Sequence, residues 1–366
     1  MKTVKAAVCR GFVVPLAIEE IELAAPGPRE ALVELAACAI CHSDITFAEG
    51  GWGGHIPAVY GHEAAGIVAA VGTNVDTFAI GDAVLVSLLR SCETCSSCLS
   101  GRPATCTRSF DTVSHPLSKD GEPIEQGMGT GAFAEAVVVD RTQIVKIPAD
   151  IPMDAAALLS CGVITGIDAV VNTAKLRPGQ TCIVIGAGGV GLNAIQGARI
   201  AEASRIFAVD MKQEKLQTAM EFGATDGVLA TDPKPWSTAR RILGGGADFV
   251  FVTVGDVNAY DTSVRYLGTH GKTVMVGMTH NGESSSYQPA DFAALAQGMI
   301  GSKMGDTVLG RDIPWMVDLY RQGRLKLDEL VSRRWPLDEI NDAIADTRTG
   351  AAKRNVIIFR NRAALF

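Results

Sequence analysis

The chain has 366 residues, of which 47% are hydrophobic, 20% charged and 6% aromatic, and its formal net charge is −7. This length predicts two domains, and the composition excludes intrinsic disorder and fibrous structure. The negative charge argues against nucleic acid or an anionic membrane surface as a partner, because attraction to phosphate requires a basic face.

No apolar run approaches the roughly 20 residues needed to cross a bilayer, and the N-terminus lacks the apolar region of a signal peptide. We therefore expect a cytoplasmic protein with a small-molecule partner. Its nine cysteines would then be reduced, so clustered cysteines indicate metal binding or catalysis rather than disulfides.

Residues 1 to about 160 contain short β-type runs broken by Gly, Pro and Asp, which is typical of an irregular, mainly antiparallel domain. These runs are Ala31–Leu35, Ala65–Val71, Ala83–Leu88, Ala134–Val139 and Thr142–Ile147.

From about Val163 apolar strands alternate with amphipathic helices, which predicts βαβ units and a parallel sheet. The expected strands are Thr181–Ile185, Ile206–Val209, Phe249–Val254 and Thr273–Val276, and the helices are Gly189–Ala201 and Gln213–Phe222. After Met304 we expect helices at Ile313–Arg321 and near Leu337–Ala345, and a last strand at Asn355–Phe359.

Four cysteines form the pattern C-x2-C-x2-C-x7-C in a polar segment: Cys92, Cys95, Cys98 and Cys106. Four thiolates this close can enclose one tetrahedral Zn²⁺ with no open position, which makes the site structural. Buried free cysteines are a weaker alternative because the surroundings are polar. A four-iron cluster is another, although the fourth cysteine lacks the usual following proline.

Three further motifs lie far apart: CHSD at Cys41, GHE at Gly61, and CGVITG at Cys161. Together Cys41, His62 and Cys161 would provide the two thiolates and one imidazole of a catalytic zinc with an open fourth position. Each residue alone means little, because a single cysteine in an apolar segment is more often part of the core. We assign that core role to the remaining cysteines, Cys9, Cys38 and Cys182.

A glycine-rich loop follows the strand Thr181–Ile185 with the sequence Gly186-Ala187-Gly188-Gly189-Val190-Gly191. This G-x-G-x-x-G pattern at a strand-to-helix junction predicts a dinucleotide site. Asp210 ends the next strand, 19 residues after Gly191, where a carboxylate can bind the adenosine ribose and repel a 2′-phosphate. We therefore expect NAD rather than NADP.

These motifs, in this order and over nearly the whole chain, resemble the zinc-dependent medium-chain alcohol dehydrogenases. The resemblance implies an α/β fold in which a GroES-like, mainly-β catalytic domain accompanies a doubly wound parallel Rossmann domain. The first part of the catalytic domain would be residues 1–162, with the structural zinc lobe at 90–107. The Rossmann domain would be residues 163–303, and residues 304–366 would complete the catalytic domain.

The same resemblance assigns roles to individual residues. Cys41, His62 and Cys161 would hold the catalytic zinc, Glu63 would lie behind it, and Asp44 would orient His62. Ser43 would accept the alcohol proton. Many relatives continue that proton relay through a histidine where this chain has Thr46, which leaves His42 or a water to complete it.

For the cofactor, the resemblance implies contacts from Thr165 near the nicotinamide, Lys215 at the adenosine ribose, and Arg354 at the pyrophosphate. Lys215 has the alternative of a solvent-exposed helix lysine. The substrate wall would comprise Trp52, Leu88 and Phe110, all apolar, which favours an aryl or medium-chain primary alcohol and its aldehyde.

Two other branches of the same family act on different substrates. Formaldehyde dehydrogenases that act on the glutathione adduct carry an arginine where this chain has Phe110, with Arg108 two residues away. Polyol dehydrogenases usually carry glutamate where this chain has Cys161. Both substitutions count against these substrates.

An alternative of another class is a non-catalytic nucleotide-binding scaffold, which would be free to lose the ligand residues that this chain keeps. By analogy with the family we expect a homodimer or homotetramer, paired through Val264–Val276 and the segment Gly298–Ser302. The expected cofactors are two zinc ions per chain and NAD.

Overall fold

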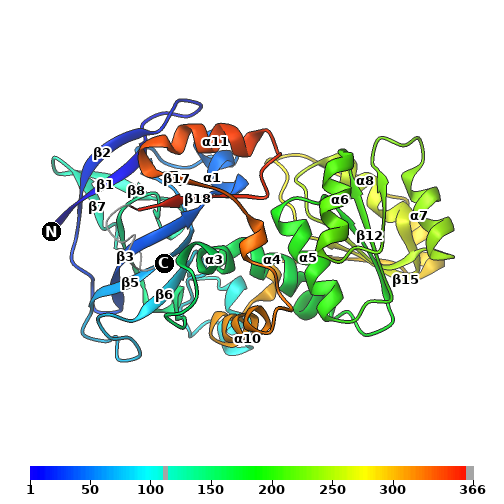
Figure 1. Ribbon diagram of the computed structural model, residues 1–366, viewed down its shortest axis with the longest axis horizontal. Helices are drawn as coiled ribbons and strands as arrows, with labels where there is room; N and C mark the ends of the chain where they lie inside the picture. The colour runs from blue at the N-terminus through cyan, green and yellow to red at the C-terminus, as the bar shows by residue number, and fades with distance from the viewer. Residues whose placement is uncertain (110–113, 360–366) are drawn as a thin grey trace. The chain divides into compact units, whose positions relative to one another are not determined.

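The computed structural model describes residues 1–109 and 114–359. The chain forms two compact units (Figure 1), which we call unit 1 (Met1–Cys161 with Val308–Phe366) and unit 2 (Gly162–Thr307). The sequence predicts domain boundaries after residues 162 and 303, whereas the units divide after Cys161 and Thr307.

Unit 1 contains a closed β-barrel with the strand order β1-β2-β7-β8-β4. Its strands are β1 (Lys2–Cys9), β2 (Ala17–Leu23), β4 (Ala58–Val59), β7 (Leu117–Lys119) and β8 (Glu122–Gln126). The first two strands pair antiparallel from Lys2 opposite Leu23 to Val8 opposite Ala17. Closure leaves no free barrel edge.

A seven-stranded sheet forms the rest of the β structure of unit 1, in the order β10-β6-β5-β3-β18-β17, with β9 also paired to β3. These strands are β3 (Glu30–Ala39), β5 (Glu63–Val71), β6 (Ala83–Ser87), β9 (Ala136–Asp140), β10 (Ile144–Lys146), β17 (Val331–Pro336) and β18 (Arg354–Ile358). Strand β18 pairs with β3 through Ile357 opposite Cys38, so the C-terminal segment completes the sheet begun by the N-terminal one.

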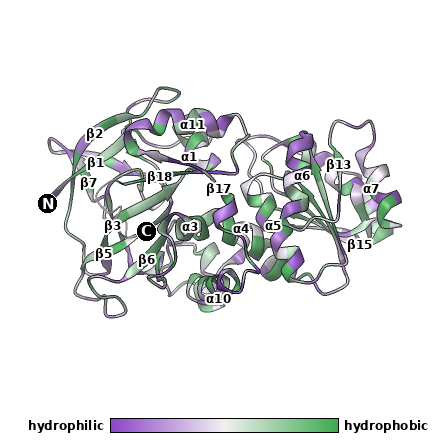
Figure 2. Cartoon of the chain, viewed as in Figure 1, coloured by the Kyte–Doolittle hydropathy of each residue, from purple (hydrophilic) through white to green (hydrophobic). Residues whose placement is uncertain are grey.

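The helices of unit 1 are α1 (His42–Ala48), α2 (Ser96–Leu99), α3 (Met153–Leu158), α10 (Leu309–Arg321) and α11 (Ile340–Arg348). Helix α11 alternates hydrophobic and hydrophilic residues (Figure 2) and buries Ile340, Ala343 and Ile344. This pattern is expected of a helix that covers a sheet on one side and faces water on the other.

Unit 2 contains one parallel six-stranded sheet with the order β13-β12-β11-β14-β15-β16. The strands are β11 (Thr181–Ile185), β12 (Arg205–Asp210), β13 (Asp226–Leu229), β14 (Ala247–Val252), β15 (Leu267–Met275) and β16 (Gly298–Gly301). The strand order reverses between β11 and β14, and sheets of this type bind ligands at the carboxyl ends of the strands beside that reversal.

Helices α5 (Gly189–Ile200), α6 (Gln213–Phe222), α7 (Pro235–Leu243), α8 (Val257–Ser263) and α9 (Pro289–Leu295) connect these strands. Helix α6 ends at Gly223, whose φ of 119° lies in the left-handed region that glycine adopts without strain. Inner strand residues such as Ile183, Phe207 and Val250 are fully buried, because helices cover both faces of such a sheet.

A helical run from Met153 to Ala174 comprises α3, η4 (Leu159–Val163), α4 (Ile164–Asp168) and η5 (Ala169–Ala174). It is long and apolar enough to cross a membrane by length and composition alone, which corrects the expectation that no apolar run approaches that length. However, 94% of its most apolar window is buried inside the protein, which is typical of a core helix.

The predicted fold class is confirmed: a mainly-β domain with a barrel accompanies a parallel Rossmann-type sheet. The strand Thr181–Ile185 and the helix Gln213–Phe222 begin and end where the sequence places them. Among the elements that the sequence did not indicate are β1, β2, β13 and α7. Segment β16 lies at the edge of its sheet, and its role in subunit pairing stays a prediction.

Candidate metal and cofactor sites

The first candidate site begins at the N-terminus of α1. Cys41 caps this helix, and its backbone N–H donates to Asp44 Oδ2 at 3.0 Å. The other carboxylate oxygen, Oδ1, accepts from Gly61 N at 2.9 Å. One buried carboxylate therefore fixes the loop of Cys41 to the segment that carries the next ligand.

His62 follows Gly61 and is completely buried. Its Nδ1 lies 2.9 Å from Asp44 Oδ1, so Asp44 accepts a hydrogen bond from that nitrogen when it carries the proton. Within the described residues His62 Nε2 has no hydrogen-bond partner. A buried ring nitrogen without a partner is costly, and a metal ion would satisfy it.

The ligand atoms of Cys41, His62, Glu63 and Cys161 all lie within 4.8 Å of one another. We call Cys41, His62 and Cys161 the buried cluster. Cys161 is fixed through its neighbour Ser160, whose carbonyl accepts from Ser87 Oγ at 2.7 Å and whose hydroxyl donates to Ala64 O at 3.1 Å. Segments distant in sequence thus converge on one point.

The polar and charged groups of the buried cluster shift one another's pKa values. A hydrogen bond from Cys161 and the charges of His62 and Arg354 hold the pKa of Cys41 well below its usual range. The same hydrogen bond, together with burial, raises the pKa of Cys161. Burial disfavours charged His62, but the Asp44 carboxylate outweighs burial and raises the pKa of His62. Two thiols and one imidazole within reach of a single ion fit Zn²⁺.

Glu63 and Arg354 form a buried pair beside this cluster. Arg354 Nη1 lies 3.3 Å from Glu63 Oε1, and the two side chains are 5% and 0% exposed. Burial raises the pKa of Glu63 to about 7, against the opposing charge of Arg354. The family resemblance places Arg354 at the cofactor pyrophosphate, and that contact stays a prediction. The pairing of Arg354 with Glu63 was not predicted, because the two residues are far apart in sequence.

Three more predicted residues lie on α1. Ser43 Oγ is 3.7 Å from Cys41 Sγ, which places its hydroxyl beside the buried cluster. His42 is exposed. Thr46 Oγ1 donates to His42 O at 3.0 Å, so its hydroxyl forms a bond within its own helix.

The second candidate site is the four-cysteine lobe, in which the Sγ atoms of Cys92, Cys95, Cys98 and Cys106 also lie within 4.8 Å of one another. Backbone N–H groups point at these sulfurs: Cys95 N is 3.2 Å from Cys92 Sγ, and Cys92 N is 3.3 Å from Cys106 Sγ. N–H groups directed at sulfur stabilise thiolates. The geometry fits a closed, four-thiolate zinc site.

Glu93, between the first two lobe cysteines, ties the lobe to the rest of unit 1. Its carboxylate contacts Arg29 at 3.0 Å and also Arg141. Arg29 in turn lies 3.3 Å from buried Asp140. Buried free cysteines gain no support, because the four sulfurs converge and three of the cysteines are only partly buried.

The glycine loop of unit 2 lies between β11 and α5, at the reversal of the strand order. Gly186 has φ of 96°, and a Cβ on Gly191 would lie 1.7 Å from Gly186 O. A Cβ on Gly188, the residue that caps α5, would meet nothing within 4 Å. Open space in front of a helix N-terminus fits a phosphate group.

The other predicted cofactor residues also have defined positions. Asp210 ends β12 and accepts a hydrogen bond from Ala187 N at 2.8 Å. Lys215 lies in the first turn of α6 and is partly exposed, and Val190 is partly buried at the start of α5. Thr165, on α4, is 8% exposed and donates to Met304 Sδ at 3.4 Å.

Of the predicted substrate residues, Trp52 packs edge-on against Phe47 with ring centroids 5.2 Å apart, and Phe47 lies on α1. Leu88 follows β6 directly and is partly buried. Phe110 lies outside the described residues. The structure therefore places one apolar side chain against the helix that Cys41 caps.

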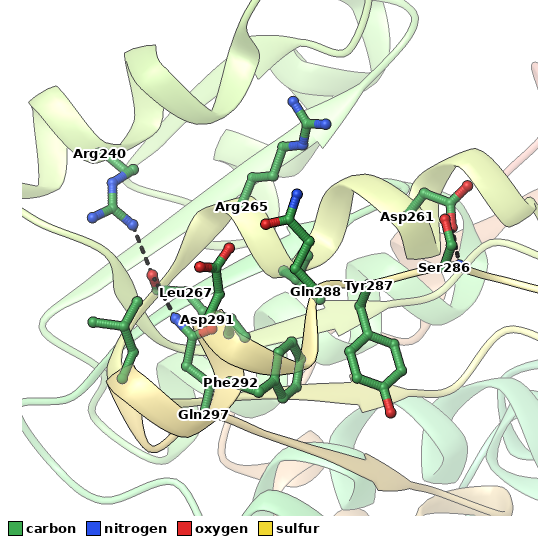
Figure 3. Close-up of a pocket in the computed structure, with 12 residues that line it drawn as sticks. Arg240, Asp261, Arg265, Leu267, Ser286, Tyr287, Gln288, Asp291, Phe292 and Gln297 are labelled. Carbon is green, nitrogen blue, oxygen red and sulfur yellow. Dashed lines mark hydrogen bonds between the residues drawn. The ribbon is translucent and has the colours of Figure 1, made fainter.

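A cavity of about 850 Å³ lies elsewhere in unit 2, between α7, α8 and α9 (Figure 3). Its arginines are engaged: Arg240 donates to Leu267 O at 2.7 Å, and the Arg265 guanidinium lies 4.6 Å from the Trp236 ring centre. None of its lining residues is a thiol, an imidazole or part of the glycine loop. We therefore do not assign the chemistry to it.

Comparison with known proteins agrees with this geometry. Residues 27–149 match the alcohol dehydrogenase GroES-like domain, and residues 189–322 match the zinc-binding dehydrogenase family. The chain is 34% identical to alcohol dehydrogenase class-3 of Myxine glutinosa, over 96% of this chain and 97% of the relative.

Solved structures give the same result. Benzyl alcohol dehydrogenase from Acinetobacter calcoaceticus is 30% identical with a TM-score of 0.93, covering 98% of this chain and all of that one. A zinc-binding dehydrogenase from Sinorhizobium meliloti 1021, solved with NADP, is 27% identical with a TM-score of 0.82, covering 98% and 100%. The chain belongs to the zinc-dependent medium-chain alcohol dehydrogenase family, and it is a zinc- and nicotinamide-dependent oxidoreductase.

Proposed function

We propose that this enzyme transfers hydride between NAD and a primary alcohol or its aldehyde, with aryl or other apolar compounds as substrates. The observation that carries this proposal is the buried cluster, in which Asp44 fixes His62 so that Nε2 faces Cys41 and Cys161. A scaffold protein would have no need of this arrangement.

Bound zinc supplies a Lewis acid that favours loss of the alcohol proton, and bound nicotinamide supplies the hydride acceptor. Cys41, His62 and Cys161 would hold the metal. Asp44 keeps the proton on Nδ1 of His62 and so leaves Nε2 free to bind.

Ser43 is the group we assign to the alcohol proton, because its hydroxyl is 3.7 Å from Cys41 Sγ. His42 is the next group that can carry this proton towards solvent, since it is exposed and Thr46 has no titratable group. Glu63 and Arg354 balance each other's charge beside the thiolates and keep a neutral pair behind the metal position.

The preference for NAD is supported by Asp210, whose carboxylate ends β12 beside the glycine loop. A negative charge there repels the 2′-phosphate of NADP. Kd values for NADH and NADPH, measured by fluorescence, test the preference, and tighter binding of NADPH would contradict it.

The apolar substrate class is supported by Trp52, whose ring packs edge-on against Phe47 of α1, the helix that Cys41 caps. It is also supported by the likeness to a benzyl alcohol dehydrogenase. The likeness to a class-3 alcohol dehydrogenase is of similar strength. The glutathione adduct of formaldehyde is therefore the second candidate substrate.

Initial rates of NADH formation separate the two candidates. The panel contains benzyl alcohol, short and long aliphatic alcohols, a polyol, and formaldehyde with glutathione. Higher kcat/KM for benzyl and long-chain alcohols supports the proposal, and reaction with the glutathione adduct alone would contradict it.

Metal analysis is the companion measurement: one zinc per chain in fully loaded enzyme would remove the basis for the catalytic cluster.

A further inference from the structure

The glycine loop of unit 2 is held from two sides by side chains of neighbouring strands. On one side, Asp210 Oδ2 accepts from Ala187 N at 2.8 Å, while its Oδ1 accepts from Lys212 N at 3.1 Å. Both oxygens of this carboxylate are thus bonded to backbone, one of them within the loop itself.

On the other side lies Thr253, the residue after β14. Its hydroxyl is 2.9 Å from Gly186 O and 3.0 Å from Ile185 O, and either carbonyl can accept its single proton. Its backbone N–H also donates to Ile185 O at 3.0 Å. Thr253 therefore fixes the strand end from which the loop departs.

The loop needs such support because of its composition. Glycine loses more backbone freedom on ordering than any other residue, and the loop contains four glycines in six residues. Gly186 is already in the left-handed region, and Gly191 packs against its carbonyl. A loop that must be ordered by its ligand binds that ligand more weakly than a loop ordered beforehand.

We propose that Asp210 and Thr253 are positioning residues that hold the glycine loop in its phosphate-binding conformation before the cofactor arrives. The proposal rests on the proposed function in one respect, namely that this loop binds a nicotinamide dinucleotide. It goes further by giving Asp210 a role independent of the adenosine ribose and by assigning a role to Thr253. It also implies that neutralising Asp210 removes a contribution to binding that NADH and NADPH share, in addition to any change in the preference between them.

Reduced nicotinamide mononucleotide is the probe that isolates this role, because it carries a phosphate but no adenosine ribose. If Asp210 acts only on the ribose, Asp210→Asn leaves binding of the mononucleotide unchanged. If Asp210 orders the loop, the same variant weakens mononucleotide binding by about threefold to tenfold, the effect of one lost hydrogen bond.

Asp248 offers a matched control for this variant. It lies at the start of β14, and its Oδ2 accepts from Thr181 N at the start of β11 at 2.7 Å. This bond is at the end of β11 and β14 opposite to the glycine loop. Asp248→Asn neutralises a comparable carboxylate that accepts from a backbone N–H, and we expect its Kd values for NADH and the mononucleotide to stay within about twofold of wild type.

Thr253 is tested by Thr253→Val, which keeps the shape and removes the hydroxyl, and by Thr253→Ser, which keeps the hydroxyl. We expect the valine variant to bind both nucleotides about threefold to tenfold more weakly, and the serine variant to restore binding. Thr273→Val is the control, because Thr273 is buried in the same sheet and pairs with Ser263.

Amide hydrogen exchange of zinc-loaded, nucleotide-free enzyme provides a readout that does not depend on activity. Exchange across residues 186–191 should be faster in Asp210→Asn and Thr253→Val than in wild type and both controls. Unchanged exchange together with unchanged mononucleotide Kd in both variants would overturn the inference, and either variant suffices if the other fails to fold. Wild-type enzyme that binds neither NADH nor NADPH would overturn the proposed function itself.

Discussion

The two thiol-rich sites of unit 1 differ in how the chain builds them. The lobe takes its four cysteines from residues 92–106, and its sulfurs are stabilised by N–H groups of the same short segment. The buried cluster takes Cys41, His62 and Cys161 from three distant segments and depends on Asp44 and Ser160 for its geometry. A local site can be closed and structural, whereas a site assembled by the fold can leave one position open for a substrate.

Removal of one ligand of the buried cluster should have the largest effect. Cys161→Ala is expected to lower kcat/KM by about three orders of magnitude or more, roughly 4 kcal/mol of barrier, and to lower the zinc content from two per chain to one. The control is Cys182→Ala, which alters a buried cysteine of unit 2. Full activity of Cys161→Ala with one zinc would reverse the assignment of the two sites.

The corresponding lobe variant, Cys95→Ser, should chiefly affect stability. Structural zinc sites contribute folding energy directly, so we expect a clear loss of free energy of unfolding, measured in denaturant, together with loss of one zinc. The zinc that remains should support turnover at low temperature. Complete loss of activity in protein that is still folded by circular dichroism would argue against a purely structural lobe.

Metal removal should reveal different thiol reactivity within the lobe. The backbone N–H groups of Cys98 and Thr107 hold the pKa of Cys95 at about 5, whereas burial raises the pKa of Cys98 to about 12. A thiolate population is nearly constant above its pKa, so after chelation Cys95 should be alkylated by iodoacetamide at nearly equal rates at pH 6 and pH 8. For Cys98 the rate should rise about a hundredfold over the same range, because each pH unit below a pKa changes the thiolate fraction about tenfold. Mass spectrometry of modified peptides measures both rates, and a steep pH dependence at Cys95 would contradict the prediction.

The buried cluster should also depend on a residue that touches no metal. Asp44→Asn removes the charge that orients His62, and loss of such a partner typically costs about 10- to 100-fold in metal affinity or activity. Zinc competition with a chelator measures the affinity. Asp140→Asn is the matched control, since Asp140 is equally buried but accepts hydrogen bonds from Thr142 and Arg29. Equal losses of zinc affinity in the two variants would indicate a general effect on folding.

The smallest effect is expected at the lobe's surface contact. Glu93→Gln weakens exposed pairs with Arg29 and Arg141, and such pairs contribute about 0.2 to 1 kcal/mol each. The change in unfolding free energy should shrink at high salt. Glu49→Gln breaks an exposed pair with Arg348 and gives the change in unfolding free energy expected of an ordinary surface pair. Loss of zinc in Glu93→Gln but not in Glu49→Gln would instead show that the contacts of Glu93 with the two arginines keep the lobe closed around its metal.

The sequence by itself determined whatever depends on local spacing. The lobe cysteines, the glycine loop with Asp210, and the strand Thr181–Ile185 all follow from residues close together in the chain, because turn chemistry, apolar periodicity and ligand spacing act over a few residues. The order of the motifs along the chain also indicated the family.

Tertiary structure alone decided which distant groups meet. No spacing rule pairs Glu63 with Arg354, bonds Thr253 to Gly186, or fixes Cys161 through Ser87, since strand pairing and burial create these contacts across tens to hundreds of residues. The same reason explains the missed barrel strand β2: its run Ala17–Leu23 contains three glutamates, and it forms a strand by pairing along its whole length with β1.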